Sequence, residues 1–337
     1  MHRKRIALML AALLLPNLAQ AQERLPVTVE LGDVSLTKLS TIMAYDHGIF
    51  ERNGLAVDMF ITPRAAEAVR EEGVIVPPKN IRSNVVADIN IGGGSPTIVR
   101  MTTVAHTQHR VILATMDNVI RFHVLARRDI TTPAQLKGKR IGFSSPGSLD
   151  HLAVLLLLKR NGIDPIRDVE MYEGAPSEGD IVNGRVDAMA GSELAIAAAR
   201  RDGLTDLADM AQFNYPMPGS GVNALASWLA ANHEAASRFM KASVEAIALM
   251  KTDRAAAYDS LTRWFGITDP EKLAAVYASA QRLPSKPYPS LDGLKLIKSL
   301  FPYRAMQVTR LETFADSSFV TALDRSGFID ALYRPKP

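Results

Sequence analysis

Residues 136–161 read LKGKRIGFSSPGSLDHLAVLLLLKRN, and they predict a strand, a hydroxyl-rich loop and a helix in that order. The apolar run at 140–143 has the length of a short strand, and the segment from Leu149 onward has the apolar content of a buried helix. Ser148 is typical of a residue that caps a helix N-terminus, and Gly162 is typical of one that stops a helix. A strand that leads into a helix is the unit from which parallel sheets are built.

The same alternation extends over the first two thirds of the chain. Apolar runs of strand length lie at residues 25–31, 55–61, 87–91, 110–115, 122–126, 140–143, 169–172 and 186–189. Helical spacing of apolar residues lies between the early strands and dominates from about residue 227, at 36–52, 64–72, 228–252, 254–265, 270–280, 291–300 and 316–326. Residues 217–221, MPGSG, are expected to form a linker or hinge. The predicted fold class is therefore α/β, with mainly parallel sheets flanked by helices and a helical C-terminal part.

The composition is that of a globular protein with more than one domain. The chain has 337 residues, of which 47% are hydrophobic and 22% are charged, and it contains no cysteine. A single hydrophobic core stops growing near about 250 to 300 residues, so this length indicates two domains. The lack of cysteine excludes a disulfide framework, a thiolate metal site and a cysteine nucleophile.

The N-terminus has the pattern of a secretory signal peptide, which we expect to be cleaved after Ala21. A basic start at residues 3–5 precedes an apolar run at 6–15, and residues 19–21 (AQA) form a small-residue cleavage pattern. Removal of residues 1–21 lowers the net charge from +4 to +1, which argues against a nucleic-acid partner. Later segments lack the apolar length of a membrane span, so we expect a soluble protein outside the cytoplasm.

Two further strand ends repeat the pattern of the opening segment. Residues 87–96, ADINIGGGSP, and residues 186–193, VDAMAGSE, each join an apolar strand that has an early aspartate to a loop of Gly and Ser. In open parallel sheets the ligand crevice lies beyond the carboxyl ends of the strands, and helix N-termini there favour anionic groups. The loop at 144–148 lacks the Lys of a phosphate-binding P-loop and the second Gly of a nucleophile elbow. Each loop alone also fits an ordinary turn, in which Ser95 caps a helix that starts at Pro96.

Candidate ligand contacts follow from these expected strand ends. The first lobe and the first crossing between lobes contribute Ser35, Thr37, Lys38, Ser95, Thr97, Asp117 and Asn118, and the second lobe contributes Arg121, Ser145, Ser148, Ser192 and Glu193. Lys38 and Arg121 would neutralise an acidic ligand, whereas Glu193 would favour a cationic or hydrogen-bond-donating ligand or pair with Arg121. Phe122 and Tyr215 lie near the expected crossings and would stack on a ring. The alternatives are a solvated surface position for the two cations, a helix-dipole role for Glu193 and core packing for the aromatic residues.

Four motifs together resemble one protein family. They are residues 44–55 (AYDHGIFERNGL), 87–96 (ADINIGGGSP), 136–142 (LKGKRIG) and 183–188 (NGRVDA). Over about residues 27–260 the chain is similar to the nitrate/taurine/alkanesulfonate-type periplasmic substrate-binding proteins of ATP-binding-cassette (ABC) importers. That group also includes binders of thiamine-pyrimidine precursors. Residues 73–83 and 191–195 depart from the family pattern.

The resemblance implies a two-lobed periplasmic-binding-protein fold (type II-like) in which a hinge lets two α/β lobes close around a small molecule. It implies a signal peptide at 1–21, the first part of lobe 1 at 22–119, lobe 2 at 120–221, and a return to lobe 1 with the helical C-terminal part at 222–337. The implied ligand is a sulfonate, a carboxylate, an aromatic acid or a pyrimidine, and the implied partner is an inner-membrane ABC permease. We expect a monomer in the periplasm, with no cofactor, no metal and no enzymatic activity.

Two alternatives stay open. His106 and His109 have the H-x-x-H spacing of half a metal site, which together with a carboxylate would suit a periplasmic metal-dependent hydrolase or lyase. The glutamate that the H-E-x-x-H pattern requires is lacking, which favours surface or core histidines. The same fold would also serve as the ligand-binding partner of a membrane sensor.

Overall fold

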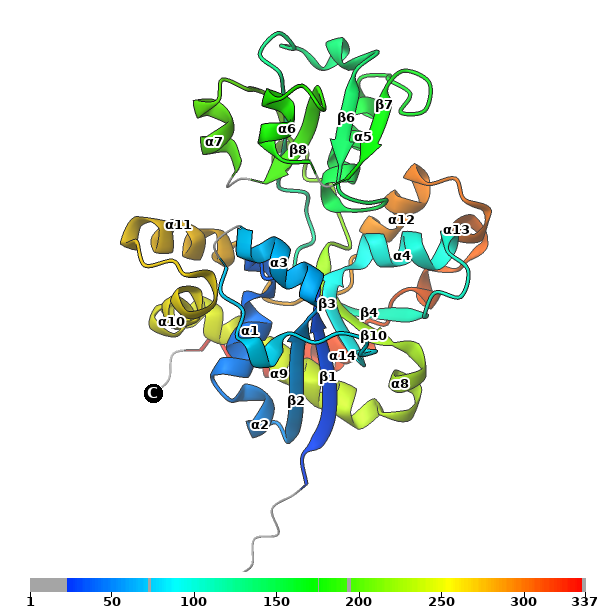
Figure 1. Ribbon diagram of the computed structural model, residues 1–337. Coiled ribbons are helices and arrows are strands. Elements are labelled where there is room, and N and C mark those ends of the chain that lie inside the picture. The colour runs from blue at the N-terminus through cyan, green and yellow to red at the C-terminus, as the bar shows by residue number, and fades with distance from the viewer. Residues whose placement is uncertain (1–22, 72–73, 175, 193–194, 335–337) are drawn as a thin grey trace, which may run out of the picture.

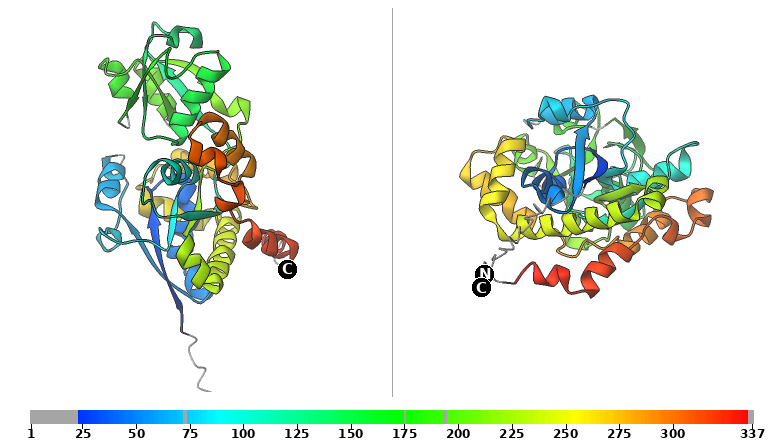
Figure 2. Two further views of the ribbon diagram at one scale, coloured as in Figure 1. Left: turned by 90° about the vertical axis from the view of Figure 1, so that its right-hand side faces the viewer. Right: turned by 90° about the horizontal axis from the view of Figure 1, so that it is seen from below.

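The computed structural model describes residues 23–71, 74–174, 176–192 and 195–334, and over these residues it shows two α/β lobes (Figure 1). Each lobe is built on one five-stranded sheet. Lobe 2 stands above lobe 1 in Figure 1, and the left view of Figure 2 shows the same stacking of the lobes from the side. None of the described helices is both long enough and apolar enough to cross a membrane. The predicted α/β fold with two sheets is confirmed.

The two sheets repeat one strand order. Sheet 1 has the order β2, β1, β3, β10, β4, formed by Leu55–Ile61, Leu25–Leu31, Ile89–Gly93, Ser220–Leu225 and Arg110–Thr115. Sheet 2 has the order β7, β6, β8, β5, β9, formed by Glu170–Glu173, Arg140–Phe143, Ala188–Ser192, Phe122–Ala126 and Thr205–Asp209. In each sheet the fourth strand, β10 or β5, runs antiparallel to both of its neighbours. The chain enters this strand directly after it has crossed from the other lobe. Each crossing therefore leads to a strand that has a neighbour on both sides.

Helices surround the sheet of lobe 1. Those that precede lobe 2 are α1 (Leu39–Asp46), α2 (Ile49–Arg52), α3 (Pro63–Glu71) and α4 (Gly94–Thr103), with 3-10 turns η1 (Leu36–Lys38) and η2 (Pro78–Asn80). Those that follow lobe 2 are α8 (Ala226–Ala231), α9 (His233–Thr252), α10 (Arg254–Phe265), α11 (Pro270–Gln281), α12 (Leu291–Leu300), α13 (Arg304–Val308), α14 (Ser318–Arg325) and α15 (Phe328–Ala331), with η5 (Leu311–Thr313). Phe50 of α2 stacks on Phe239 of α9 with ring centroids 5.0 Å apart, within the main core of this lobe.

Lobe 2 carries α5 (Leu149–Arg160), α6 (Glu178–Val182) and α7 (Ala195–Arg201), with 3-10 turns η3 (Pro133–Leu136) and η4 (Met210–Phe213). Helix α5 is buried from Asp150 to Leu158, as expected for a helix that is apolar on every side. Its leucines share one core with Ile297 of α12 and with Phe301. The C-terminal part therefore packs against lobe 2 as well as lobe 1, beside α4 (Figure 1).

The two crossing segments between the lobes run side by side and bond to each other. Met217 N–H donates to the Asn118 carbonyl (2.8 Å), and Gly219 N–H donates to the Asp117 carbonyl (3.1 Å). A Cβ on Gly219 would lie 2.2 Å from that carbonyl oxygen, so the close approach of the crossings requires glycine there. We call residues 116–121 and 214–219 the hinge.

The predicted strand bounds are confirmed for β1, β2, β4, β5 and β6. The remaining predicted strands, β3, β7 and β8, begin one or two residues later than expected. The predicted helix at 36–52 is interrupted, because Gly48 adopts a left-handed conformation (φ 65°) between α1 and α2. The sequence does not predict β9, β10, α6, α7, α13 or α15, and residues 217–221 combine the end of a crossing with the first two residues of β10.

Candidate functional site

The loop after β1 encloses Lys38, whose residue is only 4% exposed. Its Nζ donates to Asp33 Oδ2 (2.8 Å), Ser35 Oγ (3.2 Å) and Thr37 Oγ1 (3.3 Å). Burial of the Asp33 carboxyl raises its pKa, but the Lys38 ammonium outweighs this effect, and the net pKa lies below the ordinary value. The three predicted contacts of this loop, Ser35, Thr37 and Lys38, therefore lie together around one buried ion pair.

A second ion pair lies in the hinge. The Arg121 guanidinium donates to the carboxylate of Asp117, 4 residues earlier in the sequence. Burial raises the pKa of Asp117 above its ordinary value, and the charges of Arg121 and Lys38 oppose this rise. The η1 turn, which carries Lys38, lies against β10, and the carbonyl of Ser220 at the start of β10 accepts from the Asp117 N–H, so we describe the two pairs together as the charged cluster: Asp33, Lys38, Asp117 and Arg121. Its formal charges balance.

The start of α4 is anchored to the second crossing. Ser95 is fully buried, its backbone N–H and its Oγ both donate to the Pro218 carbonyl (2.9 and 3.1 Å), and Thr97 Oγ1 donates to the Gly93 carbonyl (2.8 Å). Helix α4 begins at Gly94 with Gly93 as its N-cap, so the expectation that Ser95 caps a helix starting at Pro96 is wrong. Both hydroxyls are used to hold backbone in place.

In lobe 2 the loop of residues 144–148, which we call the serine loop, closes on itself. Asp150 accepts from Ser144 N–H (2.6 Å) and Oγ (2.8 Å), and Ser148 Oγ donates to the Ser145 carbonyl (2.7 Å). Ser148 takes the predicted N-cap position of α5, but its side chain makes no capping bond. Ser145 and Ser148 are partly exposed and stay available at the loop surface.

The serine loop reaches the first lobe through Gly147. Gly147 has φ +82°, and a Cβ there would lie 2.7 Å from the Val99 side chain and 3.2 Å from the Ser95 carbonyl oxygen. Its N–H donates to Nδ1 of His151 (3.1 Å). Burial lowers the pKa of His151 to about 4, with Asp150 opposing, so the ring is neutral and can accept this bond. The carboxyl end of β6 thus meets the start of α4 across the lobe boundary.

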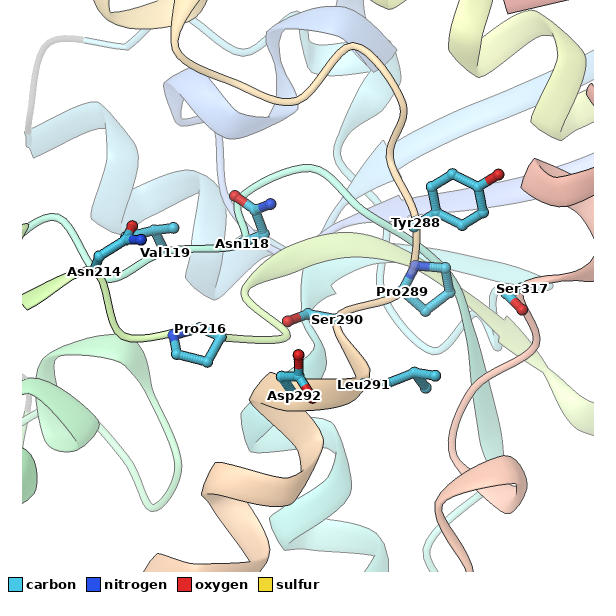
Figure 3. Close-up of a pocket in the computed structure, with 10 residues that line it drawn as sticks. All are labelled: Asn118, Val119, Asn214, Pro216, Tyr288, Pro289, Ser290, Leu291, Asp292 and Ser317. Carbon is cyan, nitrogen blue, oxygen red and sulfur yellow. The ribbon is translucent and has the colours of Figure 1, made fainter. Parts of the chain in front are cut away.

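The remaining predicted contacts lie around the hinge. Asn118 lines a hollow of about 470 Å³ with Val119, Asn214 and Pro216 from the two crossings and with the start of α12 (Figure 3). Phe122 and Tyr215 pack against the core of lobe 2. Ser192 ends β8 in register with Phe122, and Glu193 lies outside the described residues.

One site residue, Asp33, escapes the sequence analysis. Asp33 follows the first strand directly after Gly32, the same order of Gly and polar residue that marks the other strand ends, so this signal could have found it.

The two histidines of the enzyme alternative lie in the segment between α4 and β4. His106 and His109 are both exposed there, and His106 has a positive φ of 59°. Within the described ranges, no three His, Cys, Asp or Glu side chains are grouped so that they could hold a metal ion.

Each of the two five-stranded sheets contains one antiparallel strand, which the chain enters after crossing from the other lobe. This arrangement is the two-lobed periplasmic-binding-protein fold. The family described as NMT1/THI5 like matches residues 95–257, just under half of the chain. No curated protein matches the sequence. The predicted resemblance to substrate-binding proteins of the nitrate and sulfonate type is confirmed.

Solved structures share this fold at low sequence identity. The nitrate-binding protein NrtA of Synechocystis PCC 6803 has a TM-score of 0.68 and 13% identity, over 94% of this chain and 92% of that chain. The aliphatic sulphonate-binding protein SsuA of Escherichia coli has a TM-score of 0.60 and 18% identity, over 86% and 96%. A cysteine-to-serine mutant of the enzyme DszB, in complex with biphenyl-2-sulfinic acid, has a TM-score of 0.61 and 16% identity, over 90% and 99%. Such likeness shows the fold alone, which serves both binding proteins and an enzyme.

Proposed function

We propose that this chain is the exported solute-binding component of an ABC importer, which captures a small polar or anionic organic molecule between its two lobes in the periplasm. One observation carries the proposal: the strand ends of both lobes meet beside a hinge made of two hydrogen-bonded crossings. Two crossings that lie side by side allow rotation about one axis, and closure excludes water from polar contacts. We propose that the protein acts as a monomer without catalysis and delivers its ligand to an inner-membrane permease.

The proposed lobes are residues 22–119 with 222–337 and residues 120–221. In the first lobe the proposed contacts are Ser35, Thr37 and Lys38, with Ser95 and Thr97 holding the start of α4 in place. The hinge and lobe 2 contribute Asn118, Arg121, Phe122, Ser145, Ser148, Ser192, Glu193 and Tyr215. Support for this set is strongest where Gly147 of the serine loop lies against Ser95 and Val99 of α4.

Solution scattering tests the proposal. We expect a thermal-shift screen over several hundred sulfonates, carboxylates, amides and heterocycles to find stabilising compounds, since occupancy at 100 times the dissociation constant adds about 2.7 kcal/mol. We expect the radius of gyration to fall when a stabilising compound is added. A radius that stays constant with every such compound would contradict closure around a ligand.

Purified protein also separates binding from catalysis. A stabilising compound recovered unchanged after long incubation supports a binding protein, and its conversion into a product supports an enzyme on the same fold. Measurements on cells that lack the gene then separate import from sensing. Deletion of the gene should abolish uptake of the radiolabelled compound, whereas a sensor partner would change gene expression and leave uptake intact.

A further inference from the structure

A second hollow, which we call the basic hollow, lies at the end of lobe 1 that points away from lobe 2. Its volume is about 450 Å³, and its lining consists of Arg24, Glu51, Arg52, Asn53, Gly54 and Arg238. Helix α2 and the first residues of β1 lie at this end, at the bottom of Figure 1. Strand β1 is 7 residues long and leads from here to the loop that carries Lys38, a separation of about 20 Å. The basic hollow is therefore distinct from the strand ends beside the hinge.

The fold brings three arginines to this hollow from distant parts of the chain. Arg24 directly precedes β1, Arg52 ends α2 and Arg238 lies in α9. Arg238 is held in place, because its guanidinium donates to the Gly54 carbonyl (3.4 Å) and to the carboxylate of Glu234. Gly54 has φ +71°, and a Cβ there would lie 2.4 Å from Nη1 of Arg238, so glycine lets this guanidinium lie against the backbone.

The positive charge of the basic hollow is only partly matched. Among the residues that the structure describes, neither Arg24 nor Arg52 forms an ion pair, and Arg52 donates to the His47 carbonyl (2.6 Å). Glu51 shares the lining, but its Oε2 is buried without a hydrogen-bond partner and makes no ion pair with these arginines. Three guanidinium groups therefore face two carboxylates, those of Glu51 and Glu234, and most of the N–H groups of Arg24 and Arg52 are left to donate to an anion.

We propose that the basic hollow binds the phosphate group of a small phosphate ester, with Arg24 and Arg52 donating to its oxygens and Arg238 adding positive charge. One guanidinium fork satisfies the two oxygens of a carboxylate, whereas a phosphate ester offers oxygens to donors that approach from several directions. The hollow is larger than a phosphate ion requires and has the volume of a small-molecule site, which leaves room for the group that the phosphate carries. The same chemistry belongs to a soluble phosphate ester and to the headgroup of an anionic phospholipid. This second site is independent of solute capture between the lobes.

Two arms of one binding experiment distinguish the sources of the phosphate group. In the first, glycerol 3-phosphate, glycerol and inorganic phosphate are titrated by calorimetry in a buffer free of phosphate and sulfate. In the second, the protein is sedimented with vesicles of phosphatidylcholine alone or mixed with phosphatidylglycerol. We expect glycerol 3-phosphate to bind at least as tightly as inorganic phosphate and glycerol to give no signal, because the phosphate oxygens supply the charge-assisted bonds.

Substitutions in the lining test the site itself. The double variant Arg24→Gln, Arg52→Gln should lose at least about tenfold in affinity for glycerol 3-phosphate. Both arginines are exposed, so its melting temperature should stay close to that of the wild type. The control is Arg64→Gln, Arg304→Gln, which removes the same charge from two exposed arginines outside the hollow and should keep wild-type affinity. Glu51→Gln should bind the ester more tightly, because it removes a carboxylate that repels the anion.

The outcomes separate this inference from the proposed function. Binding of glycerol 3-phosphate or of phosphatidylglycerol vesicles, lost in Arg24→Gln, Arg52→Gln and kept in the control, supports the site and identifies the source of the phosphate group. No binding in either arm, equal losses in the double variant and the control, or tighter binding of inorganic phosphate than of the ester would overturn it. The radius of gyration should stay constant when the ester binds. Compaction by the ester that survives in the double variant would place it between the lobes, which would overturn this site and support solute capture.

Discussion

Acidification should weaken the fold through one buried histidine, His151. Its ring stacks on Phe143 with centroids 4.2 Å apart and accepts a hydrogen bond from Gly147 N–H at 3.1 Å. Burial lowers its pKa from the ordinary 6.5 to about 4. The residue is 8% exposed, so solvent screens this effect little. A proton on Nδ1 would break the bond that holds Gly147, and with it the contact of the serine loop with α4.

The direction of the effect follows from proton binding. The unfolded chain protonates His151 near pH 6.5 and the folded chain near pH 4, so between these values the unfolded state binds more protons. The free energy of unfolding therefore falls as pH is lowered through this window, is unaffected by this group above it, and has lost the full amount below about pH 4. A pKa difference of about 2.5 corresponds to a loss of about 3 kcal/mol.

Urea unfolding at pH 7, 5.5 and 4 measures this loss when the wild type is compared with His151→Gln. Glutamine keeps an acceptor for the Gly147 N–H and does not titrate, so its stability should lack the His151 component. We expect the wild type to lose about 3 kcal/mol more than the variant between pH 7 and pH 4. His109→Gln, at an exposed position, should behave like the wild type. Equal losses in wild type and His151→Gln would refute the reasoning.

Four further substitutions have expected outcomes. Gly221→Ala should cost about 3 kcal/mol or more in calorimetry, because its Cβ would lie 2.0 Å from the carbonyl oxygen of Ala114. Gly138→Ala, with φ +74° and open space around it, should cost only about 1 kcal/mol; equal costs would contradict the steric argument. Ser148→Leu should weaken a compound from the screen about tenfold or more while the unliganded melting temperature changes little, since an exposed helix-end serine is worth about 1 kcal/mol; an equal loss of both would make this residue structural only. Lys38→Met should destabilise the unliganded protein by about 1 to 2 kcal/mol, because it removes the cation that pairs with the Asp33 carboxylate, and a stability equal to wild type at pH 7 would contradict the pairing.

The sequence predicts those strands best whose apolar residues form a simple run. β1, β2, β4, β5 and β6 have such runs, and their predicted bounds agree with the structure. Strand β10, SGVNAL, reads as a loop because small and polar residues occupy it. Its place in the sheet depends on tertiary contact: Gly221 pairs with Gly92 of β3, and it fits against Ala114 only without a side chain. Composition along the chain carries no signal for such a contact.

Several predicted contacts have the right position and a different role. Ser95 and Ser148 lie at the expected strand ends, yet Ser95 holds the second crossing and Ser148 bonds its own loop. A hydroxyl can bind a ligand, cap a helix or tie down backbone, and only the geometry of its neighbours decides among these. Residue type and spacing therefore locate a candidate site better than they assign the task of each side chain.

The two cations show why the charge of a ligand cannot be inferred from the basic residues of its site. Lys38 and Arg121 suggest an anion when taken one at a time, and the neighbours NrtA and SsuA bind nitrate and aliphatic sulphonate. Their partners Asp33 and Asp117 are 5 residues before Lys38 and 4 residues before Arg121, but such short spacings occur throughout any charged sequence. Burial requires the pairing at Asp117, because a carboxylate excluded from water must be matched by a cation or a donor. Two cations that are each matched by a carboxylate carry no net positive charge between them, whatever their presence in the sequence suggests.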